Sequence, residues 1–163
     1  MELARALRRT PVPQGAREVR FLLFDGEEAT DDSRPFAATG LRGSQAYAAR
    51  HDGQLAALVL LDFVGTKGLI IRREALSDAA LWDRLRAAAR RVGAQAAFPR
   101  GIRQGIEDDH IPFRTRGVPA IDLIQWPYDC WHMTCDDLDA VEERSLDLTG
   151  ETVLELVRTL RRT

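Results

Sequence analysis

A mostly apolar run at residues 55–63 constrains the fold of this chain more than any other feature. Its length suits one strand, and its nearly continuous hydrophobicity suits a strand that is buried on both faces. Similar runs lie at residues 19–24 and 118–124, and segments with helical periodicity separate these runs. Strands and helices that alternate in this way are typical of a mostly parallel sheet between two layers of helices. The sequence therefore predicts an α/β fold, a three-layer αβα sandwich with a mostly parallel mixed sheet.

The helical segments are defined by their apolar stripes and their end signals. The clearest one begins at Ser77 as its cap, places Leu81, Leu85, Ala88 or Ala89, and Val92 on one face, and ends at Gly93. The other predicted elements are helices at residues 2–9, 44–50 and 149–160, a polar loop at 31–41 and a short strand at 69–71.

Composition favours one globular domain over residues 1–163. The 163 residues are 45% hydrophobic and carry a formal net charge of −2, with Lys and Arg scattered along the sequence. We therefore expect no nucleic acid as a partner. No stretch reaches the roughly 18 to 20 apolar residues of a membrane helix, so we expect no membrane as a partner either. Residues 1–10 lack the apolar core of a secretion signal, and the localisation stays open.

Carboxylates follow the first predicted strand directly. The run at residues 19–24 ends in Asp25-Gly26-Glu27-Glu28. Packing does not require three acids at this point, whereas ligand clefts form at the carboxyl ends of strands in open α/β folds. Two adjacent glutamates suit one metal ligand and one proton carrier.

Candidate side chains also accompany the later strands. Because parallel strands end at the same edge of a sheet, residues that follow them can converge with the paired glutamates. Carboxylate and imidazole groups are zinc ligands, so the sequence predicts a zinc site at this edge. The candidates are Asp62 near the end of the second run, the acidic sequence Asp108-Asp109-His110, and Trp131-His132 after the third run.

Structural alternatives stay open for the aspartates. Asp62 is also compatible with a buried structural acid that accepts hydrogen bonds from backbone amides. Asp108 and Asp109 are also compatible with caps of the helical turn before Pro112.

Six short motifs extend over nearly the whole chain. They are Phe24-Asp25-Gly26-Glu27-Glu28-Ala29, Gly43-Ser44, Leu60-Leu61-Asp62, Asp108-Asp109-His110-Ile111-Pro112-Phe113, Gly117-Val118-Pro119 and Trp131-His132. Each motif alone is weak, but together they make the sequence resemble the glutaminyl-peptide cyclotransferase branch of the zinc aminopeptidase family. Their order and approximate spacing match that family, which has a zinc-dependent exopeptidase fold.

The resemblance implies a role for each matched residue. Glu27 would move protons, whereas Glu28 and His132 would bind Zn²⁺. Asp62 and Asp108 would belong to a hydrogen-bonded proton network in the cyclotransferase branch. In two-zinc aminopeptidases, the counterpart of Asp62 instead binds the second metal ion.

The implied activity is zinc-dependent chemistry on the amino terminus of a peptide or protein. In the cyclotransferase reaction, an amino-terminal glutamine closes onto its own side-chain amide and ammonia leaves. Glu27 would act first as a general base and then as a general acid, and Trp131 would form an apolar wall of the pocket. The alternative is an aminopeptidase, in which Glu27 would activate a zinc-bound water for peptide hydrolysis.

One zinc ligand of the family has no counterpart in the chain. The family places this aspartate just before a helix that residues 2–7 resemble, and the chain begins inside that helix. We expect the chain to be the carboxyl-terminal portion of a longer protein, with a sheet that is incomplete on its amino-terminal side. Such a sheet has an exposed edge, which favours self-association. The alternative is a metal-deficient relative that only binds peptides or a partner chain.

Cys130 and Cys135 bracket His132, and three states are open for them. A disulfide is expected if the protein is exported, and two reduced thiols are expected in the cytosol. In the third state, both thiolates join His132 on a metal ion.

Overall fold

Two parallel strands form the centre of the fold. The computed structural model describes residues 2–162. In it, β1 (Leu58–Asp62) pairs with β4 (Ala120–Ile124), and the register runs from Leu58 opposite Ala120 to Asp62 opposite Ile124. A second, shorter parallel pair joins β2 (Arg73–Glu74) to β3 (Ile102–Arg103). Since β1 and β4 run in the same direction, the segments that follow them leave from one edge of the sheet.

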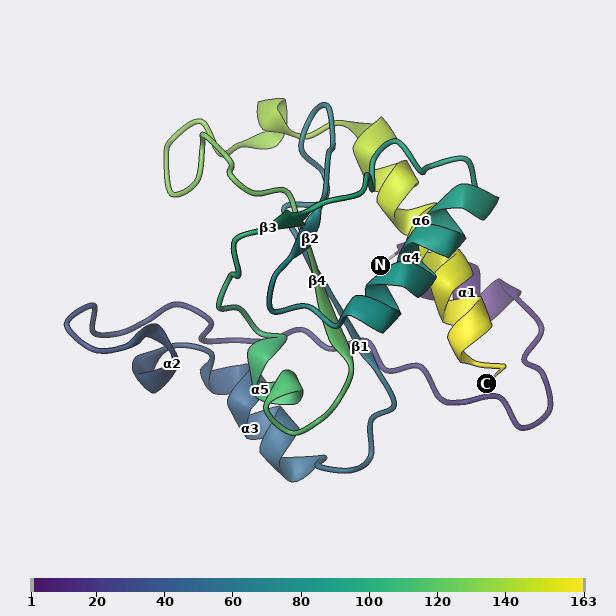
Figure 1. Cartoon of the computed structure of the whole chain (residues 1–163), viewed down its shortest axis with the longest axis horizontal. Helices are drawn as coiled ribbons and strands as arrows, with labels where there is room; N and C mark the ends of the chain where they lie inside the picture. The colour runs from purple at the N-terminus through teal and green to yellow at the C-terminus, as the bar shows by residue number, and fades with distance from the viewer. Residues whose placement is uncertain (1, 163) are drawn as a thin grey trace.

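Helices cover both faces of the β1–β4 pair, as Figure 1 shows. On one side α4 (Ala79–Arg91) packs against α6 (Glu143–Leu160), and α1 (Glu2–Arg9) contacts α6. On the other side α3 (Arg42–Arg50) contacts α5 (Ile111–Arg114). The short α2 (Phe36–Thr39) and the 3-10 helix η1 (Leu138–Ala140) lie in connecting segments. The predicted α/β architecture, with a parallel sheet between helices, is confirmed.

Alternation along β4 assigns its side chains to the two faces. Ile121 and Leu123 are fully buried in the core that contains α4 and α6, whereas Ala120 belongs to the smaller core beside α3 and α5. Successive side chains of a strand point to opposite faces. Asp122 therefore shares the face of α3 and α5 with Ala120, although it is as buried as its apolar neighbours.

The predicted stripe of α4 is confirmed except at Val92, and the cap differs by one residue. Val92 follows the last residue of the helix and is 36% exposed. Leu81, Leu85 and Ala88 are buried. The side chain of Asp78 accepts a hydrogen bond from the backbone amide of Leu81 and so caps the helix. The hydroxyl of Ser77 instead accepts a hydrogen bond from the backbone amide of Asp122 at 2.8 Å. The sequence thus predicted a short polar cap at the start of the helix but chose the wrong residue. The hydroxyl of Ser77 is occupied by Asp122, which lies in a strand remote in sequence.

The prediction of a strand at residues 19–24 is wrong. This segment has no regular secondary structure, and the side chains of Phe21 and Leu23 are 48% and 91% exposed. A strand exists only where a neighbouring strand supplies hydrogen-bond partners, and no described strand pairs with this segment. Hydrophobicity alone therefore does not fix its conformation.

Other details of the elements also differ from the predictions. The short strand lies at residues 73–74 instead of 69–71, and α6 begins at Glu143, earlier than residue 149. The segment at residues 31–41 contains α2, and α5 has no side-chain cap from either aspartate before it. Within residues 2–162, no helix combines the length and the apolarity needed to cross a membrane.

Candidate active site

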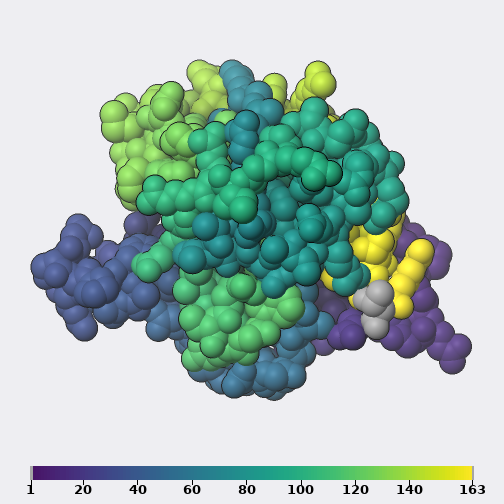
Figure 2. Space-filling model, viewed as in Figure 1, coloured from purple at the N-terminus to yellow at the C-terminus, as the bar shows by residue number. Residues whose placement is uncertain are grey.

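The predicted site residues line one cleft of about 620 Å³ beside the carboxyl ends of β1 and β4. Figure 2 shows the dark-blue segment around residues 28–40 and the light-green segment around residues 125–137 on the same side of the molecule. The structure brings together Glu27, Glu28, Asp62, Asp108, Trp131 and His132. Their placement meets the geometric requirement of the predicted site, while their chemical roles remain predictions. The cleft is also lined by Phe36, Leu60, Leu61, Phe63, Gln104, Gly105, Ile106, Glu107, Asp109, Ile124 and Trp126.

The start of α3 holds the segment that carries the two glutamates. Backbone amides of Leu41, Arg42 and Gly43 donate to the carbonyl oxygens of Glu27, Gly26 and Asp25 at 2.8, 2.9 and 3.0 Å. This close approach requires glycine at position 43, because a Cβ there would overlap the carbonyl oxygen of Asp25. The glycine of the Gly43-Ser44 motif is thus required for this contact.

The guanidinium group of Arg42 adds a second attachment. Its Nη1 donates to the carbonyl oxygen of Glu28 at 2.9 Å and to that of Thr39 at 2.5 Å. Gly26 has a φ of +69° and lies against this guanidinium. The backbone on both sides of Glu27 is therefore fixed, while the side chains of both glutamates remain available to the cleft.

Glu28 and His132 meet at the mouth of the cleft. Their Oε1 and Nε2 atoms are 3.3 Å apart, and their side chains are 70% and 55% exposed. The ring of Trp131 stacks on that of His132, with 4.2 Å between ring centroids and an interplanar angle of 28°. Trp126 contacts Trp131 edge to face at 5.1 Å. The imidazole thus lies between a carboxylate and an aromatic face.

This pair fits two positions of a zinc site. Two ligand atoms at about 2.0 to 2.1 Å from a tetrahedral ion are about 3.3 Å from each other, which is the distance between Glu28 and His132. A zinc site in an enzyme has three protein ligands and one open position. Residues 2–162 contain no group of three or more His, Cys, Asp or Glu side chains placed to hold one ion. The described residues therefore offer two candidate ligands and not a complete set.

Glu27 is one of two cleft carboxyl groups whose pKa lies near neutral pH. Burial, followed by the negative charges of Glu28, Asp109 and Asp62, raises its pKa to about 7. A carboxyl group with this pKa is half protonated at neutral pH, so it can accept a proton in one step and return it in the next.

Further acids lie deeper in the cleft. Burial is the main cause that raises the pKa of Asp108 to about 7, and nearby carboxylates add to it. Burial also raises the pKa of Asp62 and of Asp109 above the ordinary aspartate value. Asp108 accepts a hydrogen bond from the backbone amide of Asp109 at 2.5 Å. The alternative of a purely structural Asp62 is weakened by its place on the cleft wall, but its role stays a prediction.

Three buried polar side chains, those of Asp122, Glu74 and His110, lie behind the cleft. No sequence motif predicts them as a group. Asp122 is fully buried, and burial together with the charge of Asp108 raises its pKa well above the ordinary value. Glu74 and His110 are also buried, with 3.4 Å between Oε1 and Nε2. An acid inside an apolar strand, as at Asp122, is the one signal that sequence reasoning offers for such a group.

The two cysteines form a disulfide in the structure. The alternative in which both thiolates bind a metal ion with His132 is therefore wrong for this state, because the sulfur atoms are bonded to each other.

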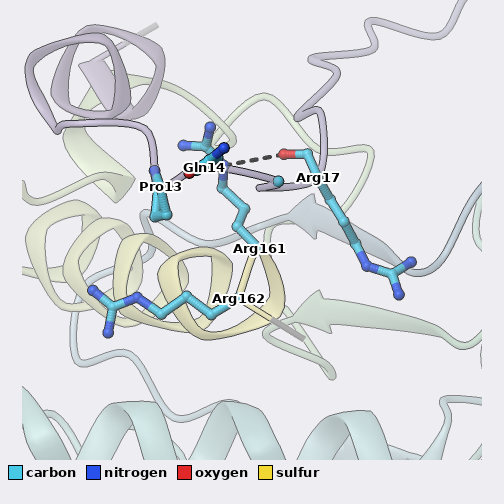
Figure 3. Close-up of a pocket in the computed structure, with 6 residues that line it drawn as sticks. Pro13, Gln14, Arg17, Arg161 and Arg162 are labelled. Atoms are coloured by element: carbon cyan, nitrogen blue, oxygen red, sulfur yellow. Dashed lines mark hydrogen bonds between the residues drawn. The ribbon is translucent and has the colours of Figure 1, made fainter.

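A second hollow, of about 530 Å³, lies between the loop at residues 13–17 and the end of α6. Figure 3 shows that the guanidinium groups of Arg17 and Arg162 point away from each other, while Arg161 Nε donates to the carbonyl oxygen of Arg17 at 3.2 Å. These cations do not converge on a common ligand position, so we assign no function to this hollow.

Comparisons with known proteins point to one family. The profile of Peptidase family M28 matches residues 1–157. The chain is 29% identical to the glutaminyl-peptide cyclotransferase of Boiga dendrophila over 181 residues, which cover 90% of this chain and 49% of that protein. The chain spans about half the length of the curated relatives it matches.

Solved structures give the same result. A glutaminyl cyclase from an Acidobacteriales bacterium has a TM-score of 0.78 and 35% identity, with 85% of this chain and 51% of that chain covered. A Zn-dependent exopeptidase from Parabacteroides distasonis has a TM-score of 0.71 and 26% identity, with 82% and 52% covered.

Proposed function

Because this chain belongs to peptidase family M28, we propose that its cleft serves glutaminyl-peptide cyclotransfer. In this reaction the α-amine of an amino-terminal glutamine attacks the carbon of its own side-chain amide, and ammonia leaves. The observation that carries the proposal is Glu27, a carboxyl group with a pKa of about 7 in the same cleft as the Glu28–His132 pair. The likeness to a cyclotransferase and to a glutaminyl cyclase supports this reaction among those of the family.

The charges in the cleft support a peptide amino terminus as the substrate. Its lining includes the carboxyl groups of Glu27, Glu28, Asp62, Glu107, Asp108 and Asp109, and no lining residue is Lys or Arg. A cationic α-amine is attracted to such a site. Trp131, Trp126 and Phe36 supply apolar surface for the aliphatic part of the glutamine side chain.

Glu27 carries out the proton transfer in this proposal. The nucleophile is the neutral form of the amine, which forms when the bound ammonium group loses a proton to solvent. As the neutral amine nitrogen bonds to the amide carbon, it loses one further proton to the Glu27 carboxylate. Glu27 then gives that proton to the departing nitrogen, which leaves as ammonia when its bond to carbon breaks. The pKa values of Asp62 and Asp108 are raised mainly by burial, so these acids take up protons more readily than ordinary aspartates and limit the negative charge around Glu27.

Glu28 and His132 would hold Zn²⁺, in agreement with the zinc dependence of the family. When bound, the ion would polarise the carbonyl that is attacked. The proton transfers above depend on the residues of this chain alone.

Peptide hydrolysis is the second candidate. The likeness to a Zn-dependent exopeptidase favours it, and Glu27 would then take a proton from water instead of from the amine. The incomplete ligand set of the described residues favours a third candidate, a metal-deficient relative that binds peptides without turnover.

Ammonia release separates these functions. We expect the zinc-loaded chain to convert a Gln-initiated peptide into its cyclic form, with one ammonia per peptide. A peptide with an acetylated amino terminus is the matched control, because its nitrogen is no longer a nucleophile. Release of the first amino acid without ammonia would support hydrolysis. Peptide binding without either product, together with no bound metal by mass spectrometry, would support the third candidate and contradict cyclotransfer.

A further inference from the structure

We propose that the Cys130–Cys135 disulfide is a positioning device for His132. It holds the imidazole opposite Glu28, and its reduction releases His132 from the cleft while the core stays folded. The inference builds on the proposed function, because His132 is one of the two ligand candidates that this function uses.

Core packing does not hold the loop that carries His132. Residues 131–139 are all exposed, and neither core cluster contains a residue from 125–142. A loop without buried apolar contacts opens at little cost. Apart from the ring contacts of Tyr128 with Phe63 and of Trp131 with Trp126, the position of His132 therefore depends on bonds within the loop.

Hydrogen bonds within the loop are local. The backbone amide of Met133 donates to the carbonyl oxygen of Cys130 at 2.9 Å, and that of Asp136 donates to Met133 at 3.1 Å. Tyr128 donates from its hydroxyl to Asp136 Oδ1 at 2.9 Å. These bonds shape turns between residues 128 and 136, but none of them joins the loop to β1 or to the segment of Glu28.

The backbone of His132 needs an external constraint. Its φ is +55°, in the left-handed region that residues with a Cβ rarely adopt. Such a conformation persists only when the surrounding structure imposes it. The disulfide joins Cys130 to Cys135, five positions further along the chain, and so closes a small loop that contains His132. This loop excludes most of the extended conformations that would relieve the strain.

Reduction removes that constraint. A dithiol reductant supplies two electrons and two protons, the Sγ–Sγ bond breaks, and two cysteine thiols form while the reductant closes into its own disulfide. The backbone at residue 132 can then relax, and the imidazole moves away from Glu28. Oxidation of the two thiols restores the pair.

The test compares the oxidised chain, the chain reduced with dithiothreitol, and the Cys130→Ser/Cys135→Ser variant. We expect the nuclear Overhauser contact between the His132 ring and the Glu28 side chain to disappear in the second and third samples. Hydrogen exchange at residues 128–136 should accelerate at least tenfold, while exchange of the β1 and β4 amides changes less than twofold. The double variant should also bind zinc at least tenfold more weakly in competition with a chelator.

His132→Ala is the matched control. It should weaken zinc binding as the double variant does but leave exchange at residues 128–136 unchanged, because its disulfide is intact. Dithiothreitol should change nothing in the double variant.

Two results would overturn the proposal. One is a His132–Glu28 contact that survives reduction, and the other is faster exchange in β1 and β4 as well, which would make the disulfide part of the core. If reduction frees the loop but the oxidised chain neither binds zinc nor cyclises a Gln-initiated peptide, the positioning role stands and the proposed function fails.

Discussion

At the scale of single residues, two adjacent glutamates have different environments. Glu28 is mostly exposed and lies 3.3 Å from His132, whereas Glu27 is half-buried and lies near other carboxylates that help to raise its pKa. A metal ligand must be ionised and reachable, and a proton carrier needs a pKa near the working pH. The environments therefore agree with the predicted division of roles.

Replacing each glutamate tests this division. Glu27→Gln should lower the cyclisation rate by about 10²- to 10⁴-fold, the range for loss of a general base, while zinc affinity changes little. Glu28→Gln should lose the metal. Steady-state kinetics and mass spectrometry of the bound metal measure the two effects. Equal metal loss in both variants would show that the roles are shared and not divided.

Asp108 makes stability depend on pH. Its pKa is about 7 in the folded chain against 3.8 as the ordinary value, so the folded state holds a proton that the unfolded state has already lost. The free energy of unfolding should therefore fall as pH rises from about 4 to about 7. Asp108→Asn should reduce this slope in chemical denaturation with a chelator present.

Asp31 provides the control for this experiment. Hydrogen bonds from Ser33 lower its pKa, so its contribution has the opposite sign, and Asp31→Asn should not reduce the slope. If the free energy of unfolding of Asp108→Asn depended on pH as strongly as that of the unsubstituted chain, another acid of the cleft would be the one that holds the proton.

At the scale of elements, the amino-terminal turn of α3 positions the segment that carries Glu27 and Glu28. The three backbone hydrogen bonds from residues 41–43 depend on a close approach that only glycine permits at position 43. The segment at residues 25–27 is held although it has no regular secondary structure, because its carbonyl groups accept hydrogen bonds from the unpaired amides at the start of a helix.

Gly43→Ala tests this attachment. The added Cβ would overlap the Asp25 carbonyl, and such overpacking costs about 1 to 3 kcal/mol. We expect lower stability in chemical denaturation and a loss of activity larger than the loss of stability explains, because Glu27 moves. Gly150→Ala in α6 is the control, since a Cβ there meets nothing within 4 Å, and it should be neutral or slightly stabilising.

Elements differed in how well the sequence predicted them. The stripe of α4 and the apolar run of β4 were sufficient, because these elements bury the residues that define the pattern. The run at residues 55–63 also contains a strand, but the expectation that it is buried on both faces is wrong, because no residue of β1 is fully buried and Leu61 is 43% exposed. Residues 19–24 show an equally apolar run without a strand. Pairing depends on a neighbour that the run itself does not specify.

At the scale of the whole molecule, the fold leaves apolar surface without cover. Leu23 is 91% exposed, Phe21 is 48% exposed, and within the described residues β1 and β4 pair only with each other. Exposed apolar segments and open strand edges favour association with another chain.

We predict that the isolated chain self-associates through this segment. Leu23→Lys should raise the monomer fraction in size-exclusion chromatography with light scattering at micromolar concentrations. Leu138→Lys is the control, because Leu138 is 88% exposed in η1, remote in sequence from this segment. A monomer at every concentration would contradict the prediction.

The sequence by itself determined the α/β class, the family likeness and six of the residues that line the cleft, because motifs and strand ends are local in the chain. The tertiary structure decided which of these residues meet. It placed Glu28 against His132, joined the two cysteines, and buried Asp122 behind the acids of the cleft. A pKa near 7 for Glu27 could not be read from a Glu-Glu pair, since burial and neighbouring charge raise it, and both depend on chain segments that lie far apart in sequence.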